Sequence, residues 1–142
     1  MSIPATVACL CGKVELALGG APQARANCHC ASCRDFYATP MLAASAWAAA
    51  DVRVVKGELR RYAHPDKQMS RAFCAECGEL MFGTNRLGMA VLPNGLAARA
   101  AGGALPPALA PQMHLFYAER VLEVADALPK YLRGWDGPLL AG

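Results

Sequence analysis

Hydrophobic and polar residues alternate with a period of two along much of the chain, which is the pattern of half-buried β-strands. The clearest example lies within Thr6–Leu18, where Val14, Leu16 and Leu18 alternate with more polar neighbours. The composition of Gly19–Pro22 predicts a turn directly after it. We therefore expect a β-strand here, interrupted once by a loop that contains two cysteines.

Further short strands are predicted by the same pattern and by the β-branched and aromatic residues around it. They lie at Ala24–Cys30, Val52–Lys56, Leu59–Tyr62, Leu80–Phe82, Met89–Leu92 and Met113–Tyr117. Met41–Trp47 is favoured as a buried strand although its alanines also suit a helix, and Met69–Cys74 leads into the last cysteine group. Leu96–Pro111 is rich in Ala, Gly and Pro and predicts an irregular connection, and Leu128–Arg133 predicts a short final element. The predicted fold is mainly β, a single domain over residues 1–142 with short helical turns at most.

Seven cysteines interrupt this pattern in three closely spaced groups, Cys9–Cys11, Cys28–Cys33 and Cys74–Cys77. No secretory signal sequence is visible, so we expect the protein to be cytoplasmic, where thiols stay reduced. An odd number of cysteines also argues against a disulfide framework. The clustering instead predicts metal binding, and soft thiolate ligands favour zinc.

The two outer groups predict a closed, structural zinc site. Residues i and i+2 of an extended segment face the same side, so Cys9 and Cys11 can reach one ion. Cys74 and Cys77 supply two further ligands, and Gly78 after them permits the positive φ that such turns need. Four thiolates complete the tetrahedral shell of zinc and tie distant segments together.

The central group supplies only three thiols, Cys28, Cys30 and Cys33, and therefore predicts an open, catalytic zinc site. The fourth position of that zinc would hold water or a substrate atom. Two alternatives stay open at this point. A fourth protein ligand, such as His29 or His114, would close the site, and a redox pair of Cys30 and Cys33 would leave Cys28 without a role. For both histidines we favour a packed, hydrogen-bonded role.

The three thiolate ligands and the net charge limit the kinds of reaction and partner that fit this protein. A zinc ion bound by three thiolates is electron-rich, so it suits a further soft ligand better than it generates hydroxide. Reactions at the sulfur of a small thiol, or at the carbon attached to it, therefore fit better than peptide hydrolysis. The formal net charge of +3 falls to zero when seven thiolates and two Zn²⁺ ions are counted, which argues against nucleic-acid binding. No uncharged run is long enough for a membrane helix.

Charged and aromatic residues near the cysteines are secondary candidates. Arg34 predicts either a residue that binds a substrate carboxylate or a structural ion pair with Asp35 or another acid. Phe36 and Tyr37 either form a wall of the pocket or belong to the core. The remaining basic residues of this part of the chain are expected on solvated strand faces: Arg60, Arg61, Lys67 and Arg71.

The cysteine motifs and their surroundings resemble the glutathione-dependent formaldehyde-activating enzyme family, which includes centromere protein V-like domains. The segments that carry the resemblance are Cys9–Gly12, Asn27–Arg34, Gly57–Tyr62, Phe73–Gly78, Pro111–His114 and Lys130–Gly134. All seven cysteines are in place. The sequence departs from the family pattern at Asp35–Tyr37, where the family often has a basic residue followed by small ones.

The resemblance implies a β-tent fold with one structural and one catalytic zinc, divided between the cysteines as described above. It implies a carbon–sulfur lyase that interconverts S-(hydroxymethyl)glutathione with glutathione and formaldehyde. The expected partner is a small thiol such as glutathione, with neither nucleic acid nor membrane. The rival hypothesis is a non-catalytic zinc module that binds a protein partner or carries a thiol adduct.

Overall fold

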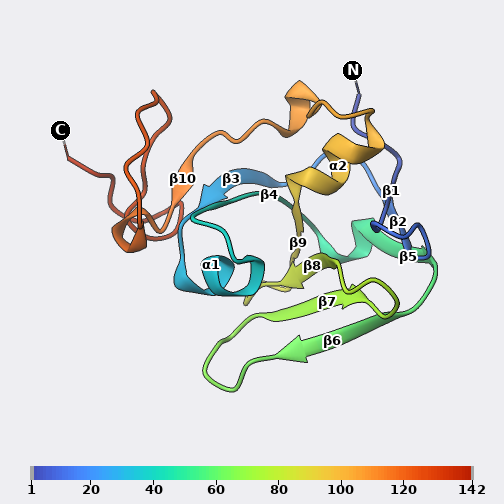
Figure 1. The fold of residues 1–142 in the computed structure, drawn as a ribbon. Coiled ribbons are helices and arrows are strands. Elements are labelled where there is room, and N and C mark those ends of the chain that lie inside the picture. The colour runs from blue at the N-terminus through green and yellow to red at the C-terminus, as the bar shows by residue number, and fades with distance from the viewer. Residues whose placement is uncertain (1, 142) are drawn as a thin grey trace.

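Ten β-strands form two separate sheets in the computed structural model, which describes residues 2–141 (Figure 1). The smaller sheet has the order β1-β2-β5 and is antiparallel throughout. Its strands are Thr6–Ala8 (β1), Glu15–Leu18 (β2) and Val52–Lys56 (β5). The alternation predicted for β2 is present, because Leu16 and Leu18 are buried whereas Glu15 and Ala17 are only half-buried.

The larger sheet has the order β10-β3-β4-β9-β8-β7-β6. Its strands are Ala24–Cys28 (β3), Leu42–Trp47 (β4), Leu59–Ala63 (β6), Ser70–Cys74 (β7), Leu80–Thr84 (β8), Ala90–Pro93 (β9) and His114–Leu115 (β10). Neighbouring strands are antiparallel, except that β10 runs parallel to β3. This pairing brings a late segment of the chain to the central cysteine group, because Leu115 is the register partner of Cys28.

The strands lie where the sequence pattern predicts them, and the mainly-β prediction is confirmed. The differences concern two segments in the last third of the chain. The predicted strand Met113–Tyr117 is reduced to β10, because Phe116 has a left-handed backbone with φ of 54° and ends it. The predicted element Leu128–Arg133 takes part only in isolated β-bridges.

A short helix follows the central cysteine group directly. This helix, α1 (Ala31–Tyr37), has Cys30 as its N-cap and ends at Ala38, whose φ of 50° is left-handed. The backbone between Cys30 and Cys33 forms the first turn of α1. The helix therefore holds two of the three central cysteines at a fixed spacing.

A second helix, α2 (Asn94–Ala100), corrects the prediction of an irregular connection over Leu96–Pro111 in its first part. Alanine favours helix, and Leu96 and Ala97 are buried where α2 packs against β1 and β4. Short 3-10 turns occur at Ala49–Asp51 (η1), Pro107–Leu109 (η2) and Tyr117–Glu119 (η3).

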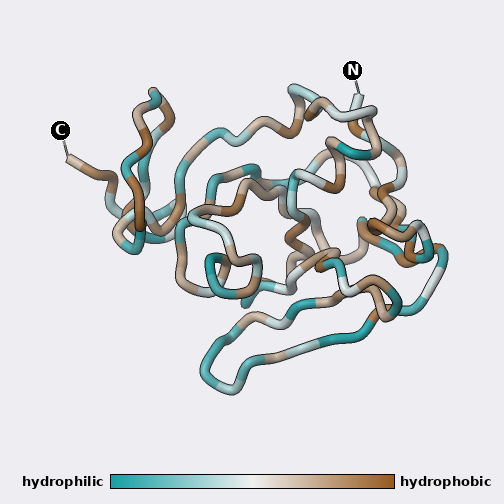
Figure 2. The backbone as a smooth tube through the Cα atoms, viewed as in Figure 1, coloured by the Kyte–Doolittle hydropathy of each residue, from teal (hydrophilic) through white to brown (hydrophobic). Residues whose placement is uncertain are grey.

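The hydrophobic core lies between the two sheets. Val7 and Leu16 contribute from the smaller sheet, Trp47 and Met81 from the larger one, and Leu109 from η2, all of them fully buried. Figure 2 shows that β6 and the turn after it are mostly hydrophilic, in keeping with their exposure. No helix among residues 2–141 has the length and apolar character needed to span a membrane.

Candidate metal centres

The four cysteines of the outer groups lie together although they come from distant parts of the chain. The ligand atoms of Cys9, Cys11, Cys74 and Cys77 all lie within 4.8 Å of one another. The Sγ atoms of Cys9 and Cys11 are 3.5 Å apart, and those of Cys11 and Cys74 are 3.8 Å apart. Zinc–sulfur bonds of about 2.3 Å give a tetrahedron with edges of about 3.8 Å. This four-cysteine cluster could therefore hold a metal ion such as zinc.

Two tight turns build the four-cysteine cluster. After β1, the Gly12 N–H donates to the Cys9 carbonyl; after β7, the Gly78 N–H donates to the Cys74 carbonyl. The two glycines have φ values of 80° and 79°, which other residues rarely adopt. Burial alone would raise the pKa of Cys9, but the N–H of Val14, 3.2 Å from its sulfur, and the neighbouring cysteines lower it to about 6. The turns thus favour a thiolate at this position.

The three central cysteines converge at the junction between β3 and α1. The ligand atoms of Cys28, Cys30 and Cys33 also lie within 4.8 Å of one another, and the Sγ atoms of Cys28 and Cys30 are 3.3 Å apart. The Cys30 sulfur accepts a hydrogen bond from the Cys33 N–H at 3.3 Å. All seven cysteines are free, so Cys30 and Cys33 form no disulfide. This three-cysteine cluster could also hold a metal ion.

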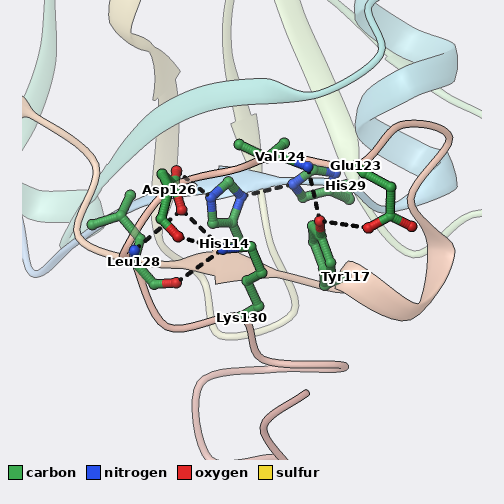
Figure 3. A network of polar contacts seen from close by, with 8 residues as sticks. All are labelled: His29, His114, Tyr117, Glu123, Val124, Asp126, Leu128 and Lys130. Atoms are coloured by element: carbon green, nitrogen blue, oxygen red, sulfur yellow. Dashed lines mark hydrogen bonds and ion pairs between the residues drawn. The ribbon is translucent and has the colours of Figure 1, made fainter. Parts of the chain in front are cut away.

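No fourth Cys, His, Asp or Glu atom within residues 2–141 joins the three-cysteine cluster at this spacing. His29 and His114 are fully buried and contact each other instead, with His29 Nε2 2.9 Å from His114 Nδ1. The other ring nitrogen of His114 lies 2.9 Å from a carboxylate oxygen of Asp126 (Figure 3). Neither histidine therefore acts as the fourth ligand, and both have packed, hydrogen-bonded positions.

The histidine contacts form a chain that reaches the surface. Hydrogen bonds from His114 and then from Lys130 lower the pKa of Asp126 to about 2. An ionised Asp126 places the hydrogen of His114 on Nε2, so its Nδ1 accepts from His29. Burial, followed by the nearby His114, lowers the pKa of His29 to about 4, so His29 is neutral at pH 7. Tyr117 packs beside both rings (Figure 3).

Three thiols packed this closely cannot all ionise without a cation beside them. Hydrogen bonding with Cys30 and Cys33, followed by burial, raises the pKa of Cys28. Hydrogen bonds from Cys28 and Cys33 lower the pKa of Cys30. A divalent cation would allow all three to be thiolates, and thiolates are the ligands that zinc prefers. The donor set therefore fits zinc.

Arg71, on β7, contacts the three-cysteine cluster. Its Nη2 lies 3.9 Å from Cys33 Sγ, and the residue is 1% exposed. The expectation that Arg71 lies on a solvated strand face is therefore wrong. The rings of Phe36 and Tyr37 on α1 cover its guanidinium carbon, at 4.5 and 5.3 Å from the ring centroids. The arginines of β6, in contrast, are exposed as expected.

Several buried side-chain polar atoms of the described residues have no hydrogen-bond partner, and they belong to residues of the central cysteine segment or to side chains that pack beside its cysteines. Among residues 2–141 these side-chain atoms are His29 Nδ1, Ser32 Oγ, Tyr37 OH and Arg71 Nε. The first two lie within the cysteine motif, Tyr37 ends α1, and Arg71 contacts Cys33. A buried polar group without a partner costs free energy, so each of these atoms could form a hydrogen bond with a bound ligand or with water.

The predicted ion pair of Arg34 is not formed with Asp35. The Nε of Arg34 donates to the carbonyl oxygen of His29 at 3.1 Å, which fixes the backbone between two of the cysteines. Asp35 pairs with Lys67, in the turn between β6 and β7, at 2.9 Å. Arg34 thus supports the cysteine loop directly.

A cavity of about 430 Å³ borders α1. Phe36 and Tyr37 form one wall, and residues of Gly78–Leu80 and of α2 form the others. No cysteine of either cluster lines this cavity. Phe36 and Tyr37 thus line a cavity that is separate from the three-cysteine cluster and pack over Arg71, so their predicted role as a wall of the zinc pocket stays a prediction.

The family model described as glutathione-dependent formaldehyde-activating enzyme matches residues 4–119. The chain belongs to this family. The match includes every cysteine of both clusters, whereas Asp126 and Lys130 lie beyond it. No curated protein matches the chain. Among solved structures, a Rhodobacter sphaeroides protein is similar, with 24% identity and a TM-score of 0.48, over 64% of this chain and 85% of that one.

Sequence reasoning missed two residues around the family's central cysteine motif, Arg71 and Asp126. An alternating strand predicts that every second residue is exposed, but α1 covers the side of β7 that carries Arg71. No local pattern marks Asp126, which reaches His114 through an irregular segment. Only knowledge of the strand pairing and of the returning chain could have identified either residue.

Proposed function

We propose that this chain is a zinc-dependent carbon–sulfur lyase that acts on a small thiol adduct such as S-(hydroxymethyl)glutathione. The four-cysteine cluster would hold a structural zinc, and the three-cysteine cluster an open, catalytic zinc. Membership of the family supports the substrate class, since the family is described by glutathione-dependent formaldehyde activation. The free thiols agree with a reducing, cytoplasmic compartment.

One observation carries this function: the unequal surroundings of the two clusters. The three-cysteine cluster has three sulfurs and, within residues 2–141, no fourth protein ligand. Tyr37 and Arg71, which each carry a buried polar atom without a hydrogen-bond partner, pack beside it. A purely structural site would need neither an open position nor unpaired polar groups.

Zinc held by three thiolates would supply a soft Lewis acid that prefers sulfur as its added ligand. The chain's own residues would hold and orient the site. The N–H of Cys33 fixes Cys30, and the guanidinium of Arg71 lies against Cys33. The unpartnered hydroxyls of Ser32 and Tyr37 would supply hydrogen bonds for the hydroxyl of the adduct.

Cleavage of the adduct breaks one carbon–sulfur bond and needs no redox partner. The electron pair of that bond stays on sulfur and leaves a thiolate. The carbon keeps its oxygen and becomes formaldehyde when the hydroxyl proton is lost, and the thiolate or solvent takes up that proton. The reverse reaction forms the same bond from thiolate and formaldehyde, so the same site serves both directions.

A second function, in which the domain carries a thiol adduct or binds a partner without catalysis, is favoured by the limited access to the cluster. Cys33 is 4% exposed, and the cavity beside α1 is lined by none of the three cysteines. A carrier would need only to bind the adduct, whereas a lyase must also accelerate its breakdown.

Exchange among ¹³C-formaldehyde, glutathione and their adduct, followed by NMR, tests the proposal. Zinc-loaded protein should accelerate the exchange above the uncatalysed rate. The Cys30→Ser variant, which changes only the three-cysteine cluster, should lose the acceleration and one of two bound zinc ions. Equal exchange with and without protein would exclude this lyase activity, and adduct binding without acceleration would favour the carrier.

A further inference from the structure

Arg71 is a buried cation without a carboxylate partner. It is 1% exposed, and no Asp or Glu within residues 2–141 forms an ion pair with it. Its polar contacts are the carbonyl oxygen of Ser70 at 3.3 Å and the sulfur of Cys33 at 3.9 Å, and its Nε has none. An arginine stays charged under all ordinary conditions, and a buried charge needs a counter-charge nearby.

A glycine on the neighbouring strand leaves space for the side chain of Arg71. Gly83 on β8 is the register partner of Arg71 on β7. A Cβ atom at Gly83 would lie 2.9 Å from Cδ, Nε and Nη1 of Arg71, which is too close. On the other side, the rings of Phe36 and Tyr37 cover the guanidinium. Aromatic faces attract a cation but do not neutralise it, so the three-cysteine cluster is the place for the compensating negative charge.

We propose that Arg71 is a positioning residue that sets the charge of the three-cysteine site, so that the site accepts an anionic sulfur ligand rather than a neutral one. Three thiolates and one Zn²⁺ carry a net charge of −1, and the guanidinium brings the buried assembly to zero. Binding of a substrate thiolate would change the net charge of this assembly to −1 when Arg71 is present, but to −2 when Arg71 is absent. This inference rests on the proposed function, because it concerns the ligand that the open site takes.

Cobalt-substituted protein provides the readout, since sulfur-to-cobalt absorption changes when a further ligand binds to the metal. We would titrate the protein with two probes at constant pH: 2-mercaptoethanol, which binds as an anionic thiolate, and imidazole, which binds as a neutral molecule. The four-cysteine cluster has no open position and serves as a reference within the same molecule. Unchanged absorption from that site shows that each variant is folded.

Arg71→Met should weaken thiol binding by at least about tenfold, because opposite charges attract strongly where water is excluded. Imidazole binding should change by less than about twofold, because a neutral ligand gains little from the charge. Arg71→Lys keeps the charge and should restore most of the thiol affinity. Arg61→Met is the matched control, since Arg61 is exposed and lies over the ring of Phe82, and it should change neither affinity.

Gly83→Ala provides a second test should Arg71→Met fail to fold. The added Cβ displaces the Arg71 side chain without removing its charge, so thiol binding should weaken and imidazole binding should not. Equal loss of both probes would show that Arg71 only supports the structure, and an unchanged thiol affinity in Arg71→Met would also overturn the inference. Failure of the inference and failure of the proposed function give different results. If the wild-type protein itself binds no thiol at its cobalt, the proposed function fails; if the wild type binds thiol and Arg71→Met binds it equally well, only the inference about Arg71 fails.

Discussion

The two cysteine clusters use the same ligand but are built in different ways. The four-cysteine cluster comes from two tight turns, and backbone N–H groups of those same turns donate to its sulfurs. The three-cysteine cluster depends on the rest of the molecule. Cys30 caps α1, Arg71 reaches Cys33 from β7, and His29 is held by contacts that extend to Asp126.

This difference follows from what each site would need. Four thiolates satisfy zinc completely, so a strong structural site needs only that the fold bring the two cysteine turns together. A site that leaves one position open must be held in shape and balanced in charge by groups that are not ligands themselves. Such support comes from distant parts of the sequence, which is what surrounds the three-cysteine cluster.

The largest expected difference is between losing a ligand of one cluster and losing a ligand of the other. Cys74→Ser should reduce the free energy of unfolding by on the order of 5 kcal/mol or more, because binding of a structural zinc is part of the folding free energy. Cys30→Ser should leave a folded protein. Thermal unfolding and the zinc content of each variant measure this. Equal destabilisation by both would contradict the division into structural and open sites.

A chelator should remove zinc from the two sites at different rates. A chromophoric chelator should remove one zinc per chain quickly and the second at least about tenfold more slowly, because an incoming ligand can attack an ion with an open position. Absorbance of the chelator complex gives both phases. In Cys30→Ser the fast phase should disappear. A single phase in the wild type would contradict the difference between an open and a closed site.

Lowering the pH should reduce the free energy of unfolding, because His29, beside the three-cysteine cluster, is held neutral in the folded protein. The folded pKa of His29, about 4, lies below its ordinary value of 6.5, so its contribution is fully present above pH 6.5. It is lost as the pH falls from 6.5 to about 4, because the unfolded chain then takes up a proton that the folded chain does not. The expected loss is of order 1–3 kcal/mol.

Denaturant unfolding of zinc-loaded protein across this pH range tests the expectation. His29→Gln retains an amide that can bond to His114 but removes the titrating group, so its pH dependence should be shallower than that of the wild type. His64→Gln, in the turn after β6 and outside the network, is the matched control. Equal slopes for His29→Gln and the wild type would exclude this role of His29.

The smallest effect concerns the start of α1. Glu119 accepts a hydrogen bond from the Ala31 N–H at 3.0 Å and so ties the segment after β10 to the helix that carries Cys33. Glu119→Ala should cost about 0.5–1 kcal/mol of stability, as for other lost helix caps. Glu119→Gln keeps an acceptor oxygen and should cost less. Thermal unfolding of the two variants tests whether Glu119→Ala loses more stability than Glu119→Gln.

Much of the fold and the division of the cysteines could be predicted because both depend on local spacing. Alternation placed the strands, as in Glu15–Leu18, and short cysteine spacings placed Cys28, Cys30 and Cys33 on one junction. The helix over Asn94–Ala100 was not predicted, because a seven-residue helix is marginal alone and is stabilised by its packing against β1 and β4.

The sequence by itself determined which neighbouring cysteines could face one ion, since chain geometry limits how far apart their side chains can lie. Only the tertiary structure brought the two outer cysteine pairs together and decided what surrounds each cluster. The pairing of Arg71 with Gly83 and the return of His114 to His29 depend on strand register and on the path of the whole chain. These contacts form because the complete fold minimises the free energy, and no short stretch of sequence contains that information.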